Sequence, residues 1–112
     1  MKVTLSNGLT ILIKWYHNNP LSKKLRSSDL KFGTICKIFK EESGKAINEL
    51  ELLNNGKSFL HDKDLNMFNK KKGRLISLKR ALYIYSPENG NYKGFMFSKE
   101  DRKLIWDAYN NL

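Results

Sequence analysis

The chain has 112 residues, enough for one hydrophobic core, and we expect a single domain over residues 1–112. Hydrophobic residues make up 40% and aromatic residues 12% of the sequence, which argues against wholesale disorder. The charge is unbalanced, with 21 Lys and Arg against 11 Asp and Glu and a net charge of +10. We therefore expect a polyanionic partner, either nucleic acid or an acidic protein surface.

Other classes of protein are excluded by what the sequence lacks. The longest apolar run, residues 9–15, is too short for a membrane span, and Met1 leads directly into a strand-like segment rather than a secretory signal. The single Cys36 cannot form an internal disulfide, and no Cys and His cluster predicts a metal site. We expect a cytoplasmic protein without metal or other cofactor.

The first half of the chain predicts an antiparallel sheet. Residues 2–6 and 9–16 flank Asn7-Gly8, a dipeptide typical of a type I′ turn, and their alternating apolar residues predict a β-hairpin. A third strand is predicted over residues 34–40, followed by a turn over 41–44. Residues 46–53 fit a strand or a helix. We favour the strand, because Asn54-Asn55-Gly56 would then close a second hairpin onto residues 57–61.

The second half predicts two helices. Asp62 and Asp64 are candidate N-caps for an apolar segment that the run of lysines at 70–72 and Gly73 interrupts, and helical spacing then covers residues 74–85. Ser98 and Asp101 form a capping-box pattern that begins the last helix, which continues to residue 112. The expected fold is therefore α+β, with a small antiparallel sheet (the hairpin plus two or three further strands) packed with two C-terminal helices.

A basic cluster at residues 69–80 is the strongest candidate binding site. It contains no acidic residue, and its position at a helix N-terminus would add backbone N–H donors and the positive end of the helix dipole. Gly73 would allow a phosphate backbone to approach closely. The alternative interpretation is a solvated, lysine-rich helix entry. The residues of this cluster are Lys70, Lys71, Lys72, Arg74, Lys79 and Arg80.

A second basic patch lies in the connection over residues 21–33. Its candidate partner-binding residues are Lys23, Lys24 and Arg26. Aromatic side chains could stack on exposed bases if they share a surface with either patch, although we favour a place in or beside the core for most of them. These are Trp15, Tyr16, Tyr83, Tyr85 and Tyr92.

The sequence gives little sign of catalysis, and we expect a protein that is not an enzyme. His61, Asp62 and Asp64 bring together an imidazole and two carboxylates, the groups of a minimal metal-dependent nuclease. No second carboxylate cluster supports that site, and helix capping explains the two aspartates better. Cys36 lies inside a predicted strand, where we interpret it as a small hydrophobic residue rather than a nucleophile.

Three motifs between residues 64 and 110 form a broader pattern: Asp64-x-x-x-Phe68-Asn69, Gly73-Arg74-x-x-x-Leu78-x-Arg80-Ala81-Leu82, and Phe97-Ser98-Lys99-x-x-Arg102-x-x-Ile105-Trp106-x-x-Tyr109. This pattern resembles the C-terminal half of small bacteriophage early and counter-defence proteins, including inhibitors of the anti-CRISPR type. The resemblance implies a protein in the host cytoplasm that inhibits a nucleoprotein defence complex through its basic face. The alternative is a nucleic-acid-binding accessory or regulatory protein.

Overall fold

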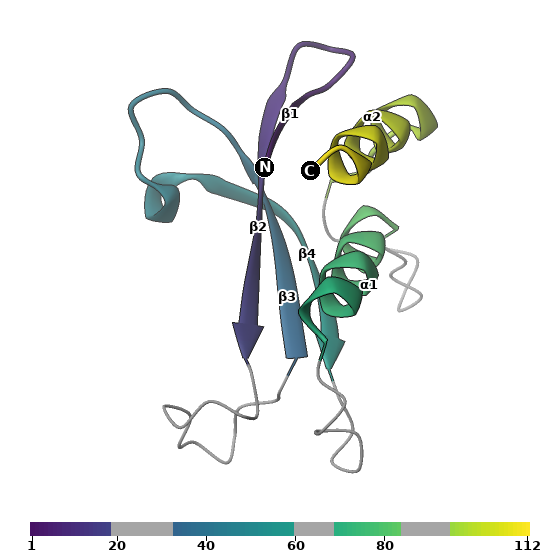
Figure 1. Cartoon of the computed structure of the whole chain (residues 1–112). Helices are drawn as coiled ribbons and strands as arrows, with labels where there is room; N and C mark the ends of the chain where they lie inside the picture. The colour runs from purple at the N-terminus through teal and green to yellow at the C-terminus, as the bar shows by residue number, and fades with distance from the viewer. Residues whose placement is uncertain (19–32, 60–68, 84–94) are drawn as a thin grey trace, which may run out of the picture.

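A four-stranded antiparallel sheet forms the first half of the protein in a computed structural model, which describes residues 1–18, 33–59, 69–83 and 95–112 (Figure 1). The strands are β1 (Lys2–Thr4), β2 (Thr10–Asn18), β3 (Gly33–Lys40) and β4 (Glu51–Phe59), and each pairs with the next along the chain. Two helices, α1 (Lys70–Leu82) and α2 (Lys99–Asn110), lie on one face of this sheet. The predicted α+β fold is confirmed.

The β1–β2 hairpin is present, but its turn differs from the predicted one. The Gly8 N–H donates to the Leu5 carbonyl at 3.0 Å, so the central residues of the turn are Ser6 and Asn7 rather than Asn7 and Gly8. Gly8 follows with a φ of 87°, a conformation that glycine adopts without steric cost. The Leu5 N–H can then donate to the Leu9 carbonyl at 2.8 Å, which closes the hairpin.

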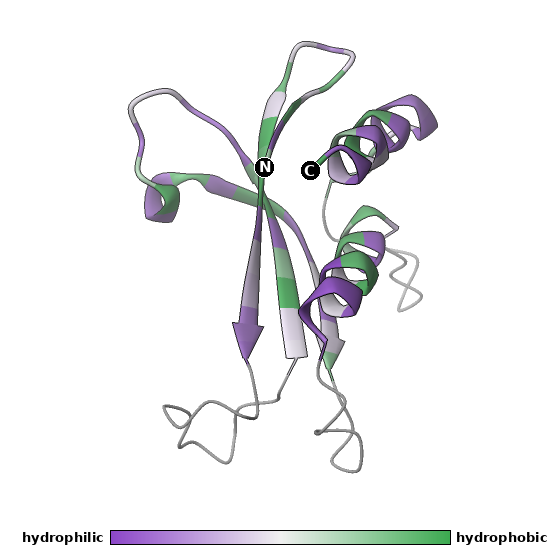
Figure 2. Ribbon diagram, in the orientation of Figure 1, coloured by the Kyte–Doolittle hydropathy of each residue, from purple (hydrophilic) through white to green (hydrophobic). Residues whose placement is uncertain are grey.

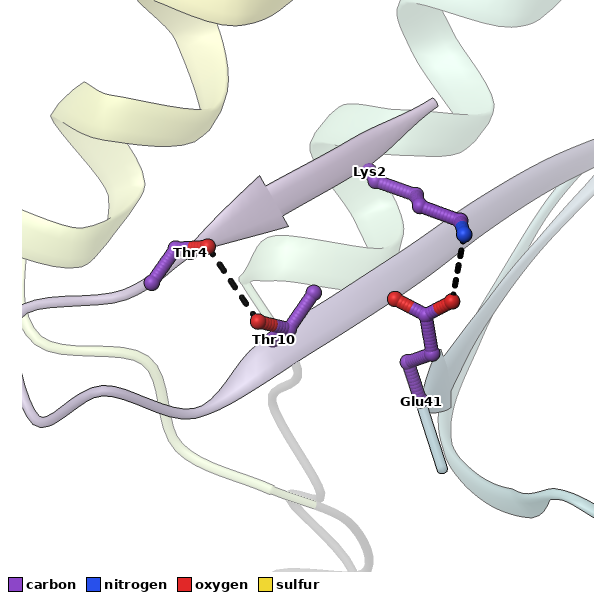
Figure 3. Close-up of polar contacts among 4 residues, drawn as sticks. All are labelled: Lys2, Thr4, Thr10 and Glu41. Atoms are coloured by element: carbon purple, nitrogen blue, oxygen red, sulfur yellow. Dashed lines mark hydrogen bonds and ion pairs between the residues drawn. The ribbon is translucent and has the colours of Figure 1, made fainter. Parts of the chain in front are cut away.

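Two polar contacts hold the edge of the sheet beside this hairpin (Figure 3). The hydroxyls of Thr4 and Thr10 lie 3.2 Å apart across the β1–β2 pair. The Lys2 ammonium on β1 pairs with the carboxylate of Glu41, which directly follows β3, at 2.5 Å. The ion pair therefore reaches across β2 and ties the first strand to the end of the third.

The second hairpin predicted at residues 54–56 is wrong, because these residues lie in the middle of β4. Asn54 pairs with Ile38 and Gly56 with Cys36 of β3, and a short 3-10 helix, η1 (Ile47–Glu49), precedes the strand. A Cβ at Gly56 would lie 2.0 Å from the carbonyl oxygen of Ser77 in α1. Gly56 therefore allows α1 to pack closely against β4, and it does not form a turn.

The α1 helix begins four residues earlier and ends three residues earlier than predicted. Its N-cap is Asn69, whose side-chain oxygen accepts from the Lys72 N–H at 3.1 Å, so the lysine run lies inside the helix. Asp62 and Asp64, the predicted caps, lie outside the described residues. Gly73 is buried, and a Cβ there would lie 2.3 Å from Thr34 Oγ1. Gly73 thus allows contact with β3, which contradicts its predicted role as an opening for phosphate.

The α2 helix begins as predicted, with Ser98 as its N-cap. The Ser98 hydroxyl accepts from the Asp101 N–H at 3.1 Å. On the inward side of α2, Ile105 is fully buried, whereas Leu104, which the apolar pattern of the sequence also assigns to the inward side, is exposed.

The core lies between the helices and the inner face of the sheet, the face that the helices cover. Its largest fully buried apolar side chains come from β2, β3 and both helices: Ile11, Ile13, Cys36, Ile38, Leu78 and Ile105. Figure 2 shows hydrophobic segments within β2 and β3 and a strongly hydrophilic N-terminal turn of α1. Cys36 therefore packs as a small hydrophobic residue, as its place in the strand predicts.

Candidate nucleic-acid interface

A hollow of about 560 Å³ lies where the first turn of α1, the last turn of α2 and the inner face of β2 meet. It combines cationic and aromatic side chains with no acidic side chain among its lining residues. The lining consists of Trp15, Lys71, Arg74, Tyr109, Asn110 and Leu112. Lys71 and Arg74 belong to the basic cluster that the sequence predicts as the binding site.

We call this hollow the first hollow. Trp15 is held in place within it by two contacts. Its indole Nε1 donates to the Arg74 carbonyl at 3.2 Å, and its ring centroid lies 5.9 Å from that of Tyr109. The ring is half-buried, so it packs against the core on one side and faces the hollow on the other. One residue of β2 therefore positions the backbone of α1 and a ring of α2.

The electrostatic potential beside the first hollow is positive. The first turn of α1 carries Lys70, Lys71 and Lys72 and no acidic residue, and the helix dipole places additional positive potential at the same end. His17, near the end of β2, responds to this field. Burial lowers its pKa below 6.5, and the positive charges of Lys70 and Arg74 lower the pKa further.

The six predicted basic residues of α1 do not form a single patch. Lys71 and Arg74 line the first hollow, whereas Lys72 is offset from them around the helix by roughly 100° and 160°. Lys79 lies seven residues after Lys72, close to two turns, and shares its side of α1. The Arg80 guanidinium donates to the Lys57 carbonyl of β4 at 2.6 Å, which is a structural contact.

Several residues singled out in the sequence lie outside the part of the chain that the structure describes. They are the second basic patch with Lys23, Lys24 and Arg26, the nuclease candidates His61, Asp62 and Asp64, and the rings of Tyr85 and Tyr92. Their predicted roles remain predictions.

A second hollow of about 740 Å³ lies between the C-terminal end of α1 and the first half of α2. Its lining residues are Tyr83, Lys99, Glu100, Arg102, Lys103 and Trp106. Three cations line this hollow, and none of them is among the predicted binding residues. Their spacing of three and four residues places Lys99, Arg102 and Lys103 together on one side of a helix, and that spacing could have revealed them.

Arg102 is held in place by two contacts in the second hollow. Its guanidinium carbon lies 4.9 Å from the centroid of the Tyr83 ring, and its Nη1 donates to the Phe97 carbonyl at 2.7 Å. The C-cap residue of α1, Tyr83, is thereby connected to the start of α2 through one side chain.

The opposite face of the sheet, which neither helix covers, is also basic and provides a useful comparison. Lys14 and Lys37 lie opposite one another on β2 and β3, and Lys57 projects from the same face of β4. The Lys37 ammonium lies 5.3 Å from the centroid of the exposed Tyr16 ring. This open face therefore carries three lysines and an exposed aromatic ring on the surface of the sheet.

Within residues 1–18, 33–59, 69–83 and 95–112, His, Cys, Asp and Glu side chains do not gather in groups of three that could hold a metal ion. Burial raises the pKa of the Cys36 thiol to about 12, which keeps it protonated at neutral pH. Neither described helix has the length and apolar character needed to cross a membrane.

Comparisons of the chain with protein-family models, with curated proteins and with solved structures found no match.

Proposed function

We propose that this protein binds nucleic acid, without catalysing a reaction, through the first hollow. The observation that carries the proposal is the presence of two cations, Lys71 and Arg74, beside two rings, Trp15 and Tyr109, in one hollow. Cationic side chains neutralise phosphates, and aromatic rings offer a stacking surface to bases. The net charge of +10 would add long-range attraction to any polyanion.

The charges in the first hollow are available to a ligand. Neither ion pair among the described residues involves Lys71 or Arg74, and the Trp15 hydrogen bond uses only the Arg74 backbone. A phosphate entering the hollow would therefore meet two cations that form no ion pair with a carboxylate of the described residues.

The test is binding of labelled DNA and RNA, single-stranded and double-stranded, across a salt series with and without Mg²⁺. We expect affinity to fall steeply with salt, by about 0.7 to 0.9 logarithmic units per phosphate contact for each logarithmic unit of salt. The double variant Lys71→Gln/Arg74→Gln should lose most of the affinity. Its matched control is Lys14→Gln/Lys57→Gln, which removes the same charge from the open face of the sheet and should retain most of the binding.

Equal losses in both double variants would contradict a specific site, because they would show that net charge alone drives binding. Failure to bind any nucleic acid at low salt would contradict the proposal altogether. It would favour the prediction that follows from the bacteriophage resemblance, an inhibitor that binds a nucleoprotein defence complex or an acidic protein surface. Cleavage that depends on Mg²⁺ would instead support the nuclease alternative at His61, Asp62 and Asp64.

A further inference from the structure

The two hollows are connected by a row of aromatic rings. Tyr109 lines the first hollow, and its centroid lies 5.9 Å from Trp15 on one side and 5.7 Å from Trp106 on the other. Trp106 lines the second hollow. The row thus runs from Trp15 on β2 to Tyr109 and Trp106 on α2, and it links one hollow to the next.

Both hollows lie along the space between the two helices. The first hollow takes residues from the first turn of α1 and the last turn of α2, and the second takes Tyr83, which caps the end of α1, together with the first half of α2. The helices therefore run in opposing directions beside the aromatic row. A ligand that followed the row would pass from one end of α1 to the other.

Positive charge is present at both ends of the row. Lys71 and Arg74 lie at the first hollow, and Lys99, Arg102 and Lys103 lie at the second. The single carboxylate among these lining residues is that of Glu100. Rings in the middle with cations on either side form the arrangement that proteins use to bind single strands, in which bases stack on rings while phosphates meet cations.

We infer that the two hollows form one continuous groove for a single-stranded nucleic acid, which rests on the proposed function of the first hollow. A duplex keeps its bases stacked on each other and presents mainly phosphates, so aromatic rings recessed between two helices would add little to its binding. A single strand can unstack its bases onto the rings, and every base has a suitable π-face. The groove therefore favours single strands over duplexes, with little dependence on base sequence.

The sequence provides a reporter for each hollow, because the chain has two tryptophans, Trp15 in the first and Trp106 in the second. Tryptophan emission is quenched when a base stacks on the indole. The variant Trp15→Phe leaves Trp106 as the sole emitter, and Trp106→Phe leaves Trp15, while each keeps an aromatic ring at the substituted position. We expect a long oligothymidylate to quench both variants and a hairpin duplex of equal charge to quench neither strongly.

The second hollow is tested separately with Lys99→Gln/Lys103→Gln, compared with Lys14→Gln/Lys57→Gln on the open face. Each phosphate contact on a single strand contributes about 0.7 to the slope of logarithmic affinity against logarithmic salt. If both lysines contact phosphates, Lys99→Gln/Lys103→Gln should therefore reduce this slope by about 1.4. The control should leave the slope unchanged. Thermal unfolding of each variant confirms that the fold is intact.

The failure of this inference can be distinguished from the failure of the proposed function. Quenching of Trp15 without quenching of Trp106, together with an unchanged salt slope in Lys99→Gln/Lys103→Gln, would overturn the continuous groove while leaving the first hollow as a binding site. Equal affinity for the duplex and the single strand would overturn the single-strand preference. Absence of binding in the unmodified protein would overturn both proposals and point to a protein partner.

Discussion

The carboxylate of Asp101, in the first turn of α2, accepts two hydrogen bonds from Ser6 in the β1–β2 turn. The Ser6 backbone N–H lies 2.9 Å and the Ser6 hydroxyl 2.8 Å from the same Asp101 oxygen, although the two residues are 95 positions apart in the sequence. Asp101 is buried, and these hydrogen bonds hold its pKa below the ordinary value of 3.8. One side chain thus ties the last helix to the first hairpin.

Replacing Asp101 should therefore destabilise the fold. Asp101→Ala leaves both Ser6 donors without this partner, and we expect the free energy of unfolding to fall by roughly 1–3 kcal/mol. Urea unfolding followed by circular dichroism measures the change. Asp107→Ala, at an exposed position of the same helix, is the control and should change stability by less than about 0.5 kcal/mol. Equal effects of the two substitutions would contradict the role of the Ser6 contact.

Low pH should remove the stabilisation that the Asp101 carboxylate contributes to the folded state. Because folding lowers the pKa of Asp101, the folded state is favoured above the ordinary value of 3.8, and the stabilisation is lost as the pH falls through the lower, folded value. The difference in stability between the unmodified protein and Asp101→Ala should therefore shrink as the pH falls below the ordinary pKa of 3.8 and through the lower, folded pKa.

Gly56→Ala should disrupt the packing of α1 on β4. The added Cβ would meet the Ser77 carbonyl oxygen at 2.0 Å and the Ala81 nitrogen at 2.4 Å, and both are backbone atoms that cannot move without shifting the helix. We expect a loss of at least about 3 kcal/mol, the upper end of ordinary overpacking costs. Gly44→Ala is the control, because that turn residue has open space around its Cβ and only its φ of 80° is strained, at roughly 1–2 kcal/mol.

The pKa of His17 should report on nucleic-acid binding. In the free protein, burial and the charges of Lys70 and Arg74 place the pKa below 6.5, so the neutral form is favoured. Phosphates bound in the first hollow would offset these two charges and raise the pKa toward or above 6.5. Titration of the histidine ring protons by NMR, with and without oligonucleotide, measures the shift, and His61→Gln leaves His17 as the sole histidine. A pKa that falls on binding would contradict the assignment of the first hollow.

Stability should also depend on His17 in a defined pH range. Because folding lowers the pKa of His17, the neutral imidazole favours the folded state. This stabilisation is present above pH 6.5 and is lost progressively as the pH falls toward the lower, folded pKa. His17→Gln should flatten this part of the stability profile.

The Cys36 thiol should resist modification in the folded protein. It is fully buried, and burial raises its pKa to about 12, so thiolate is scarce at pH 8. A thiol-reactive chromogenic reagent should react fully in urea and very slowly in buffer. Rapid labelling in buffer would show that β3 separates readily from its neighbours.

Local patterns predicted the elements whose structure depends on nearby residues. The first hairpin, β3 and the Ser98 cap follow from alternation, turn residues and capping. Gly56 could not be interpreted correctly in this way, because its role depends on a helix that passes over β4, and no local pattern contains that contact. The start of α1 was placed too late because a lysine run suggests a break, although lysine is a good helix former when its charge reaches solvent.

The candidate site was predictable only in part for the same reason. Charge composition identified Lys71 and Arg74, since a cluster of cations is visible in the sequence itself. Tyr109 was missed as a partner of Trp15, because a ring near the end of the chain comes beside β2 only when α2 has packed on the sheet. The sequence therefore indicates Lys71, Arg74 and the candidate stacking ring Trp15, but not Tyr109 beside it.

Each strand of the sheet pairs with the next strand along the chain, so the sheet can form during synthesis before the helices exist. All four strands are complete by residue 59, but the helices that cover their inner face begin at residues 70 and 99. A nascent chain emerging from the ribosome would therefore present Ile11, Ile13 and Ile38 to water on a finished sheet before any helix is available to shield them. Chains interrupted between residues 60 and 98 should accordingly be prone to aggregation, and a chaperone that binds exposed apolar surface should capture them.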